Sequence, residues 1–176
     1  MALVVNGDGN ITGLTAGGLP DASITQADLA ANIAGNGPAF SAYPSADQTP
    51  SASTWTKVSP IDTEYFDTNS NFASSRFTPT VAGYYMIIAQ LGLDYGGSYN
   101  AGVIGNAIYK NGSLYAWNRN TSGVTAYLYG IITTTALVYL NGSTDYVEMY
   151  GYNANASPVF KAGGQTLFSG YLVRSA

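Results

Sequence analysis

The chain has 176 residues, of which 46% are hydrophobic and only 9% charged, and its formal net charge is −4. Basic residues form no cluster and no stretch has the roughly 20 apolar residues of a membrane span, which argues against nucleic-acid partners and membrane insertion. Cysteine and histidine are absent, which excludes disulfides, Cys- or His-liganded metals and catalytic dyads or triads built on either residue.

Residues 1–37 differ in composition from the rest of the chain. They contain no aromatic residue and many Gly and Ala. Thr25 is a plausible N-cap with Asp28 at N3, and Gly35 is well placed to end a helix, so the sequence predicts one short helix. Such a short helix is marginal alone in water. We therefore expect either a helix that needs partner chains or a flexible leader.

From Pro38 onward, short strands alternate with turn signals, and no convincing helix follows. The expected strands are Phe40–Tyr43, Trp55–Val58, Ile61–Phe66, Arg76–Thr78, Tyr84–Leu93, Ile108–Lys110, Leu114–Trp117, Thr134–Leu140, Tyr146–Tyr152 and Leu167–Val173. The turns Asn111-Gly112-Ser113 and Asn141-Gly142-Ser143 both read as hairpins. This pattern predicts an all-β fold, an antiparallel β-sandwich over residues 38–176 behind the extension of residues 1–37.

The strand after Gly83 is nearly continuous in apolar residues and rich in Tyr and Ile. It therefore reads as a strand covered on both faces, with Tyr85 and Ile87 on one face and Tyr84 and Met86 on the other. One cover is the second sheet of the domain, and the other cover could be a neighbouring subunit.

A family resemblance appears at the same place. Phe77, five residues, Gly83-Tyr84-Tyr85 and then Ile87 resemble the F-x5-G-x-Y-x-F signature of the complement C1q globular-domain family, with Ile87 in place of the last Phe. Further landmarks follow the family's order: Ala39–Ala42, Phe66-Asp67, Asn71-Phe72, Lys110–Gly112 and Phe168–Leu172. The chain departs from the family at Ser70, where an aromatic residue or Leu is usual.

This resemblance implies a jelly roll of tumour-necrosis-factor-like topology, and members of that group usually form threefold trimers. Aromatic and aliphatic strand residues pack about the axis in such trimers. The candidate residues for a trimer interface in this chain are Tyr85, Ile87, Tyr150, Tyr152 and Tyr171.

Aromatic residues in Gly/Asn/Ser-rich segments are candidates for ligand binding, since Tyr and Trp offer flat apolar faces with a polar tip. The alternative is that each fills the sandwich or the trimer axis. The candidate receptor-binding residues are Tyr95, Tyr99, Trp117, Asn118 and Arg119.

Paired carboxylates are the remaining catalytic option, and the candidates are Glu64 with Asp67 and Asp145 with Glu148. Ordinary turn and strand-edge carboxylates explain both pairs, so we do not expect an enzyme. Asp8 opens a calcium-loop-like pattern, but its twelfth position is Leu19 where Glu is required. No dense Asp/Asn cluster indicates an axial calcium ion, and we expect no metal and no cofactor.

The segment Leu19–Ala34 resembles the short linker repeats of phage tail fibres. We therefore expect a virion protein that acts extracellularly, the receptor-binding head of a trimeric tail fibre. Its expected partners are copies of itself, a host-surface glycan or protein, and other tail proteins through residues 1–37. The alternatives are a structural trimerisation cap or virion decoration domain without a ligand, and a polysaccharide-degrading domain that uses one carboxylate pair.

Overall fold

The computed structural model describes residues 4–5, 11–12, 35–94, 103–121, 129–154 and 158–176. Its contacts divide the chain into two units, residues 1–30 and residues 31–176. In the first unit, β1 (Val4–Val5) pairs antiparallel with β2 (Ile11–Thr12). The predicted helix after Thr25 lies outside the described residues, so it stays a prediction, as does a domain boundary at Pro38.

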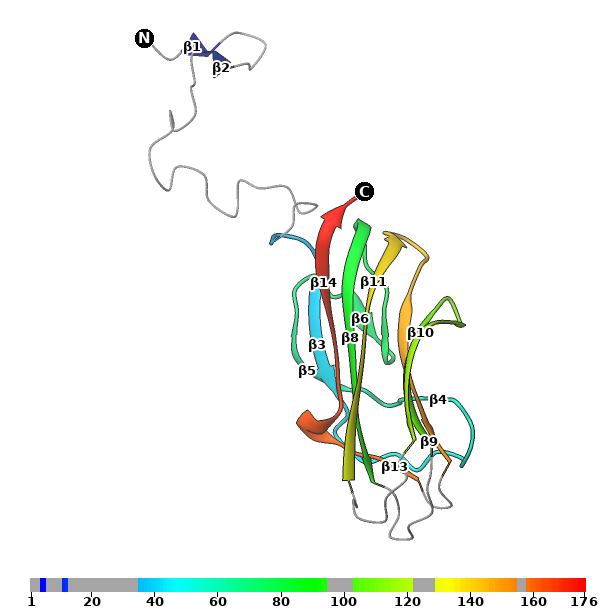
Figure 1. The fold of residues 1–176 in the computed structure, drawn as a ribbon. Helices are drawn as coiled ribbons and strands as arrows, with labels where there is room; N and C mark the ends of the chain where they lie inside the picture. The colour runs from blue at the N-terminus through cyan, green and yellow to red at the C-terminus, as the bar shows by residue number, and fades with distance from the viewer. Residues whose placement is uncertain (1–3, 6–10, 13–34, 95–102, 122–128, 155–157) are drawn as a thin grey trace. The chain divides into compact units, whose positions relative to one another are not determined.

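The second unit is a sandwich of two sheets (Figure 1). In chain order its elements are β3 (Ala39–Tyr43), β4 (Thr56–Lys57), β5 (Thr63–Asp67), β6 (Phe72–Ala73), β7 (Arg76–Phe77), β8 (Ala82–Asp94), β9 (Val103–Lys110), β10 (Ser113–Thr121), β11 (Tyr129–Asn141), β12 (Val147–Asn153), β13 (Val159–Phe160), a 3-10 turn (Gly163–Gln165) and β14 (Leu167–Ser175).

Two antiparallel sheets share these strands. The β8 sheet has the order β11-β8-β14-β3-β5, with β13 paired to the last residues of β8. The β9 sheet has the order β10-β9-β12-β7-β6, with β4 paired to β12. Most neighbours in each sheet are not consecutive in sequence, so the chain crosses repeatedly between the sheets. This is the antiparallel jelly roll that the sequence predicts.

The core lies between the two sheets. Along β8 the burial alternates as predicted. Tyr85 and Ile87 have no exposed surface, whereas Tyr84, on the outer face of the sheet, is 44% exposed. Phe40 of the β8 sheet stacks on Phe72 and Phe77 of the β9 sheet, with ring centroids 4.9 and 4.3 Å apart. These aromatic rings join the sheets near the start of β8.

The two Asn-Gly-Ser turns serve different connections. Asn111 and Gly112 both have a left-handed backbone, with φ of 51° and 76°, and they join β9 to β10 as the predicted hairpin. At the second turn Gly142 has a φ of 72°, but β11 and β12 lie in different sheets. The hairpin prediction at Asn141 is therefore wrong, because the turn carries the chain across the sandwich.

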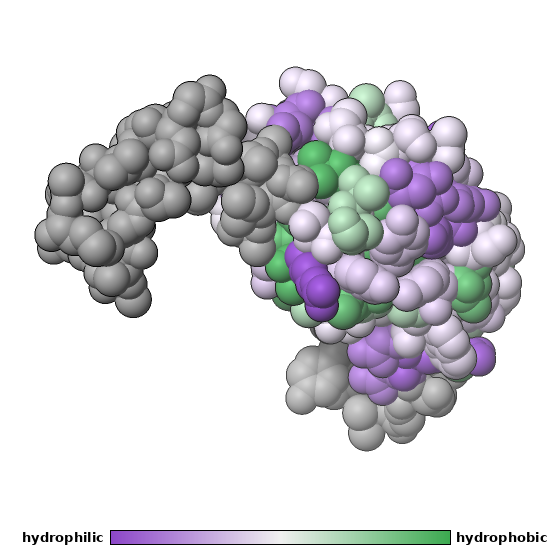
Figure 2. Space-filling model, turned by 90° about the horizontal axis from the view of Figure 1, so that it is seen from above, coloured by the Kyte–Doolittle hydropathy of each residue, from purple (hydrophilic) through white to green (hydrophobic). Residues whose placement is uncertain are grey.

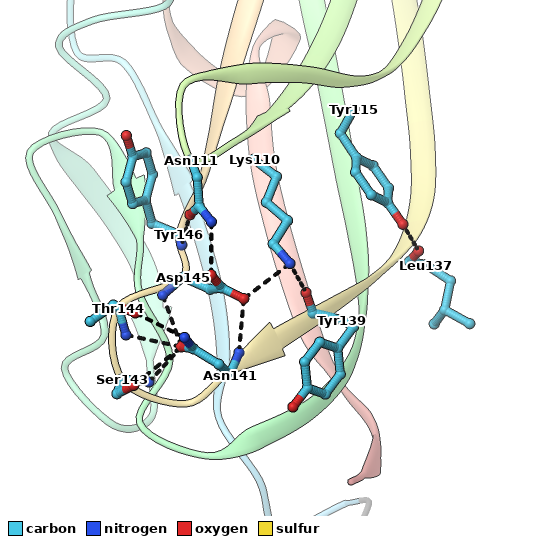
Figure 3. A network of polar contacts seen from close by, with 10 residues as sticks. All are labelled: Lys110, Asn111, Tyr115, Leu137, Tyr139, Asn141, Ser143, Thr144, Asp145 and Tyr146. Carbon is cyan, nitrogen blue, oxygen red and sulfur yellow. Dashed lines mark hydrogen bonds and ion pairs between the residues drawn. The ribbon is translucent and has the colours of Figure 1, made fainter.

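Side-chain hydrogen bonds hold this crossover (Figure 3). Asn141 Oδ1 accepts the backbone N–H groups of Ser143, Thr144 and Asp145 at 2.9–3.0 Å. Asp145 in turn accepts a hydrogen bond from Asn111 Nδ2 at 2.7 Å and pairs with Lys110 Nζ at 3.0 Å. The crossover is thus tied directly to the β9–β10 hairpin.

The surface reflects the low charge content of the chain. Seen from above in Figure 2, strongly hydrophilic residues form separate groups, and hydrophobic or weakly polar residues reach the surface between them. Within the described parts of the chain, no helix has the length and apolar character needed to cross a bilayer.

Candidate functional site

A pocket of about 340 Å³ opens on the outer face of the β9 sheet. Its lining residues come from β10, from β12 and from the residue before β4: Leu114, Trp117, Arg119, Tyr152 and Trp55. Trp117 is 53% exposed, and the Trp55 and Tyr152 rings lie 5.4 Å apart. The pocket is therefore an open aromatic surface rather than an enclosed cavity.

A β-bulge brings the three β10 residues onto one face. Leu114 lies opposite Tyr109, whereas Trp117 lies opposite Ala107, and the register shifts by one residue between Leu114 and Ala116. Without the bulge, strict alternation would place Leu114 and Trp117 on opposite faces of the sheet. The extra residue thus assembles this wall of the pocket.

A glycine lies directly against Trp55, one of the residues that line the pocket. Gly105 lies opposite both Arg119 of β10 and Tyr152 of β12. A Cβ atom built at Gly105 would lie 2.7 Å from Trp55 Cη2, closer than packed carbon atoms approach. The missing side chain lets the indole of Trp55 lie close against the sheet.

Arg119 supplies the charge of the pocket. Its guanidinium carbon lies 5.6 Å from the Tyr152 ring centroid, within cation–π range. Among the described residues, Arg119 forms no ion pair, whereas Lys57, Arg76, Lys110 and Lys161 each pair with a carboxylate. Residues 95–102, 122–128 and 155–157 contain no Asp or Glu. The positive charge of Arg119 thus has no neutralising carboxylate in the described structure.

Two stacked tyrosines extend the aromatic surface along the same face. The rings of Tyr109 and Tyr150 lie 3.8 Å apart and nearly parallel. Burial raises the pKa of both phenols above the ordinary value, and for Tyr150 the charge of Glu148 raises the pKa further. Both phenols therefore stay neutral at neutral pH, and their rings pack against each other.

The structure places the five predicted binding residues differently. Trp117 and Arg119 line the pocket together. Asn118 between them faces the opposite way, and its Nδ2 donates to the Thr133 carbonyl of β11 at 3.0 Å, so it ties the edges of the two sheets. Tyr95 and Tyr99 lie outside the described residues. Trp55, Leu114 and Tyr152 were not predicted as members of this site.

The candidate interface residues lie in three different places. Tyr85 and Ile87 are fully buried in the core, so the prediction that they face a neighbouring subunit is corrected; the alternation of β8 presents Tyr84 and Met86 outward instead. Tyr150 and Tyr152 lie on the outer face of the β9 sheet. Tyr171 is 49% exposed on β14, opposite Met86 on the outer face of the β8 sheet.

Of the candidate catalytic carboxylates, Glu148, Asp67 and Asp145 are held by structural contacts, whereas Glu64 is exposed on β5. Glu148 Oε1 lies 2.7 Å from Lys57 Nζ and 2.9 Å from an Arg76 guanidinium nitrogen, and its side chain is only 4% exposed. Asp67 Oδ2 accepts the backbone N–H of Phe72 at 2.8 Å. Within the described residues, no group of three or more acidic side chains is placed to hold a metal ion.

No protein-family model matches the chain, and no curated protein sequence matches it. Solved structures do match. The globular domain of zebrafish complement 1qA is similar with a TM-score of 0.55 and 16% identity, covering 79% of this chain and 99% of that one. The structure of Eiger TNF from S. frugiperda has a TM-score of 0.55 and 12% identity, covering 79% and 92%.

Murine APRIL is a third similar structure, with a TM-score of 0.56 and 10% identity, covering 77% of this chain and 98% of that one. Identities this low establish a shared fold and nothing finer. The two sheets, their strand order and these three structures together show that residues 31–176 form a jelly roll of the C1q and tumour-necrosis-factor type.

Proposed function

We propose that this protein is the head of a homotrimeric attachment fibre of the phage tail-fibre type, which binds a glycan or protein on the host-cell surface without catalysis. The observation that carries the proposal is the difference between the two outer faces of the sandwich. The β8 sheet exposes a broad apolar surface, and the β9 sheet exposes the aromatic pocket with Arg119, which forms no ion pair among the described residues. The first supports self-association and the second supports ligand binding.

The assembly face is the outer surface of β11, β8 and β14. Its large apolar residues are 40–59% exposed: Ile131, Leu137, Tyr139, Tyr84 and Tyr171. The register places Leu137, Met86 and Tyr171 side by side across the three strands. Contiguous exposed apolar surface of this kind marks a protein–protein contact, and we assign it to the subunit contacts of the trimer.

The ends of the sandwich favour attachment through a fibre. Pro38 accepts the backbone N–H of Leu172 at 3.1 Å, and Ser175 pairs with Gly83, so the chain enters and leaves at the start of β8. The pocket lies toward the other end, because Asn118 beside it bonds to Thr133, which pairs with Gln90 near the end of β8. A ligand can therefore reach the pocket while the end of the sandwich at the start of β8 is attached to the proposed fibre.

The contacts of Glu148 and Asp145 support a non-catalytic function for this pair. Glycoside hydrolysis requires one proton-donating and one ionised carboxyl group flanking a substrate. Glu148 is instead covered by Lys57 and Arg76, and Asp145 is held by Asn111 and Lys110. Neither group is free to meet a substrate.

Adsorption of the purified protein to bacterial cells tests the attachment function. We expect Trp117→Ala to lower the affinity for cells about tenfold, because a few aromatic residues usually carry most of the binding energy of an interface. The matched control is Tyr65→Ala, which removes an aromatic side chain that is 62% exposed on β5 and lies outside the pocket. Binding to no bacterial surface would contradict the proposal and favour a trimerisation cap without a ligand.

A further inference from the structure

We infer that the pocket binds a sugar residue that carries a carboxylate, as in an acidic surface polysaccharide. The inference rests on the proposed attachment function and specifies the ligand of the same site.

The aromatic lining fits the apolar face of a pyranose ring. Trp117, Trp55 and Tyr152 present flat rings around one opening, and aromatic rings pack well on the C–H faces of sugars while their polar tips stay hydrated. The pocket volume of about 340 Å³ is at the lower end of the range of roughly 300–1,000 Å³ for ligand sites. It therefore suits a short portion of a longer chain.

The positive charge of Arg119 favours a ligand with an anionic group, which a neutral sugar lacks. Its guanidinium lines the pocket without a carboxylate partner among the described residues. A planar guanidinium forms paired hydrogen bonds with a carboxylate, and such charge-assisted bonds are stronger than neutral ones. The ligand group that completes this site is an anion beside the stacked ring.

The charge of the surrounding face agrees with this ligand. The strands β4, β9 and β10 contain no acidic residue. Glu148 of β12 is already shared by Lys57 and Arg76, so with Arg119 this outer face is net positive although the whole chain carries −4. A local positive potential on an acidic protein favours the approach of an anionic polymer.

An array that pairs each acidic glycan with its carboxyl-reduced form tests the inference directly. The probes are uronate and sialate oligosaccharides, each printed beside its neutral counterpart. The wild-type protein is expected to bind acidic members and to lose about tenfold in affinity for them in Arg119→Gln, because a charge-assisted contact is removed. Arg119→Lys is expected to be intermediate, since it keeps the charge without the paired geometry.

The matched control is Lys161→Gln. Lys161 pairs with Asp47 and does not line the pocket, so this variant removes one positive charge away from the site. Its replacement should leave glycan binding unchanged. Trp117→Ala should weaken binding to every glycan that the wild-type protein binds, whether or not that glycan carries a carboxylate.

Three results would overturn the inference. Equal binding to the carboxyl-reduced forms would show that the anion is not recognised. Unchanged cell adsorption in Arg119→Gln would also show that the anion is not recognised. In both cases the proposed attachment function would stand. Absence of any cell adsorption by the wild-type protein would remove the attachment function itself.

Discussion

Gly83, the glycine of the C1q-like signature, has a steric role that the structure makes explicit. A Cβ atom at this position would lie 2.5 Å from the backbone oxygen of Arg174 and 2.7 Å from Leu172 Cδ1. The backbone of β14 cannot yield as a flexible side chain can, so Gly83→Ala is expected to destabilise the fold by roughly 1–3 kcal/mol. Urea unfolding followed by tyrosine and tryptophan fluorescence measures this change.

The control for that variant is Gly164→Ala. A Cβ atom there would meet only Tyr65 Oη, at 3.7 Å, so the unfolding free energy should stay within about 0.5 kcal/mol of the wild-type value. An equal loss in both variants would mean that removing any glycine, rather than the contact with β14, causes the effect.

Asp145 gives the sandwich a pH-dependent contribution to stability. The hydrogen bond from Asn111, then that from Lys110, hold the pKa of this carboxyl below its ordinary value. A lowered pKa stabilises the fold above the unfolded-state pKa of about 3.9, and the contribution is lost as the pH falls through the folded-state value. Asp145→Asn should therefore lower Tm at pH 7, by an amount equivalent to roughly 1 kcal/mol.

The difference between wild type and Asp145→Asn should shrink once the pH falls below about 4. Thermal scans of the two proteins across this range measure it. A difference that stays constant at every pH would show that the carboxylate charge does not contribute.

At the scale of elements, an aromatic cluster joins the sheets. Phe40 of β3 has no exposed surface and contacts Phe72, Phe77 and Phe168. Phe40→Ala is expected to cost roughly 3–5 kcal/mol of unfolding free energy. Phe66→Ala is the matched control, because Phe66 is 49% exposed on β5, and chemical denaturation of both variants compares them. A small loss in Phe40→Ala would contradict this account of the core.

Local patterns predicted most of the longer strands because alternation and turn chemistry act over a few residues, but they missed β6, β13 and residues 103–107 of β9. The alternating burial of β8 and the Asn111-Gly112 hairpin follow from the sequence in this way. The Asn141-Gly142 turn has the same residues, but packing of β11 against β8 and of β12 against β9 decides its role. Pairings between residues distant in sequence are not encoded in the turn itself.

The pocket was predictable in part for the same reason. Trp117 and Arg119 are two residues apart on one strand, so alternation places them on the same face. Leu114 joins them only through the bulge at Tyr115, which strict alternation misses. Tyr152 comes from β12 and Trp55 directly precedes β4, and only the sheet order brings them to this site.

At the scale of the whole molecule, the outer faces of the two sheets have different proposed roles, subunit contact for the β8 sheet and ligand binding for the β9 sheet. The β8 sheet turns an apolar outer face toward proposed subunit contacts, while the β9 sheet keeps its pocket open to solvent. Leu137 and Leu114 provide a matched pair, since they are 50% and 47% exposed on the two opposite outer faces. A buried unpaired charge at a subunit contact is strongly unfavourable, whereas the same charge on a solvated face costs little.

Light scattering of the wild-type protein and of Leu137→Glu and Leu114→Glu tests this division most directly. The account predicts a wild-type mass three times that of the 18.4 kDa chain, a monomer for Leu137→Glu, and an intact trimer with weakened ligand binding for Leu114→Glu. A monomeric wild-type protein, or dissociation caused by Leu114→Glu and not by Leu137→Glu, would contradict it.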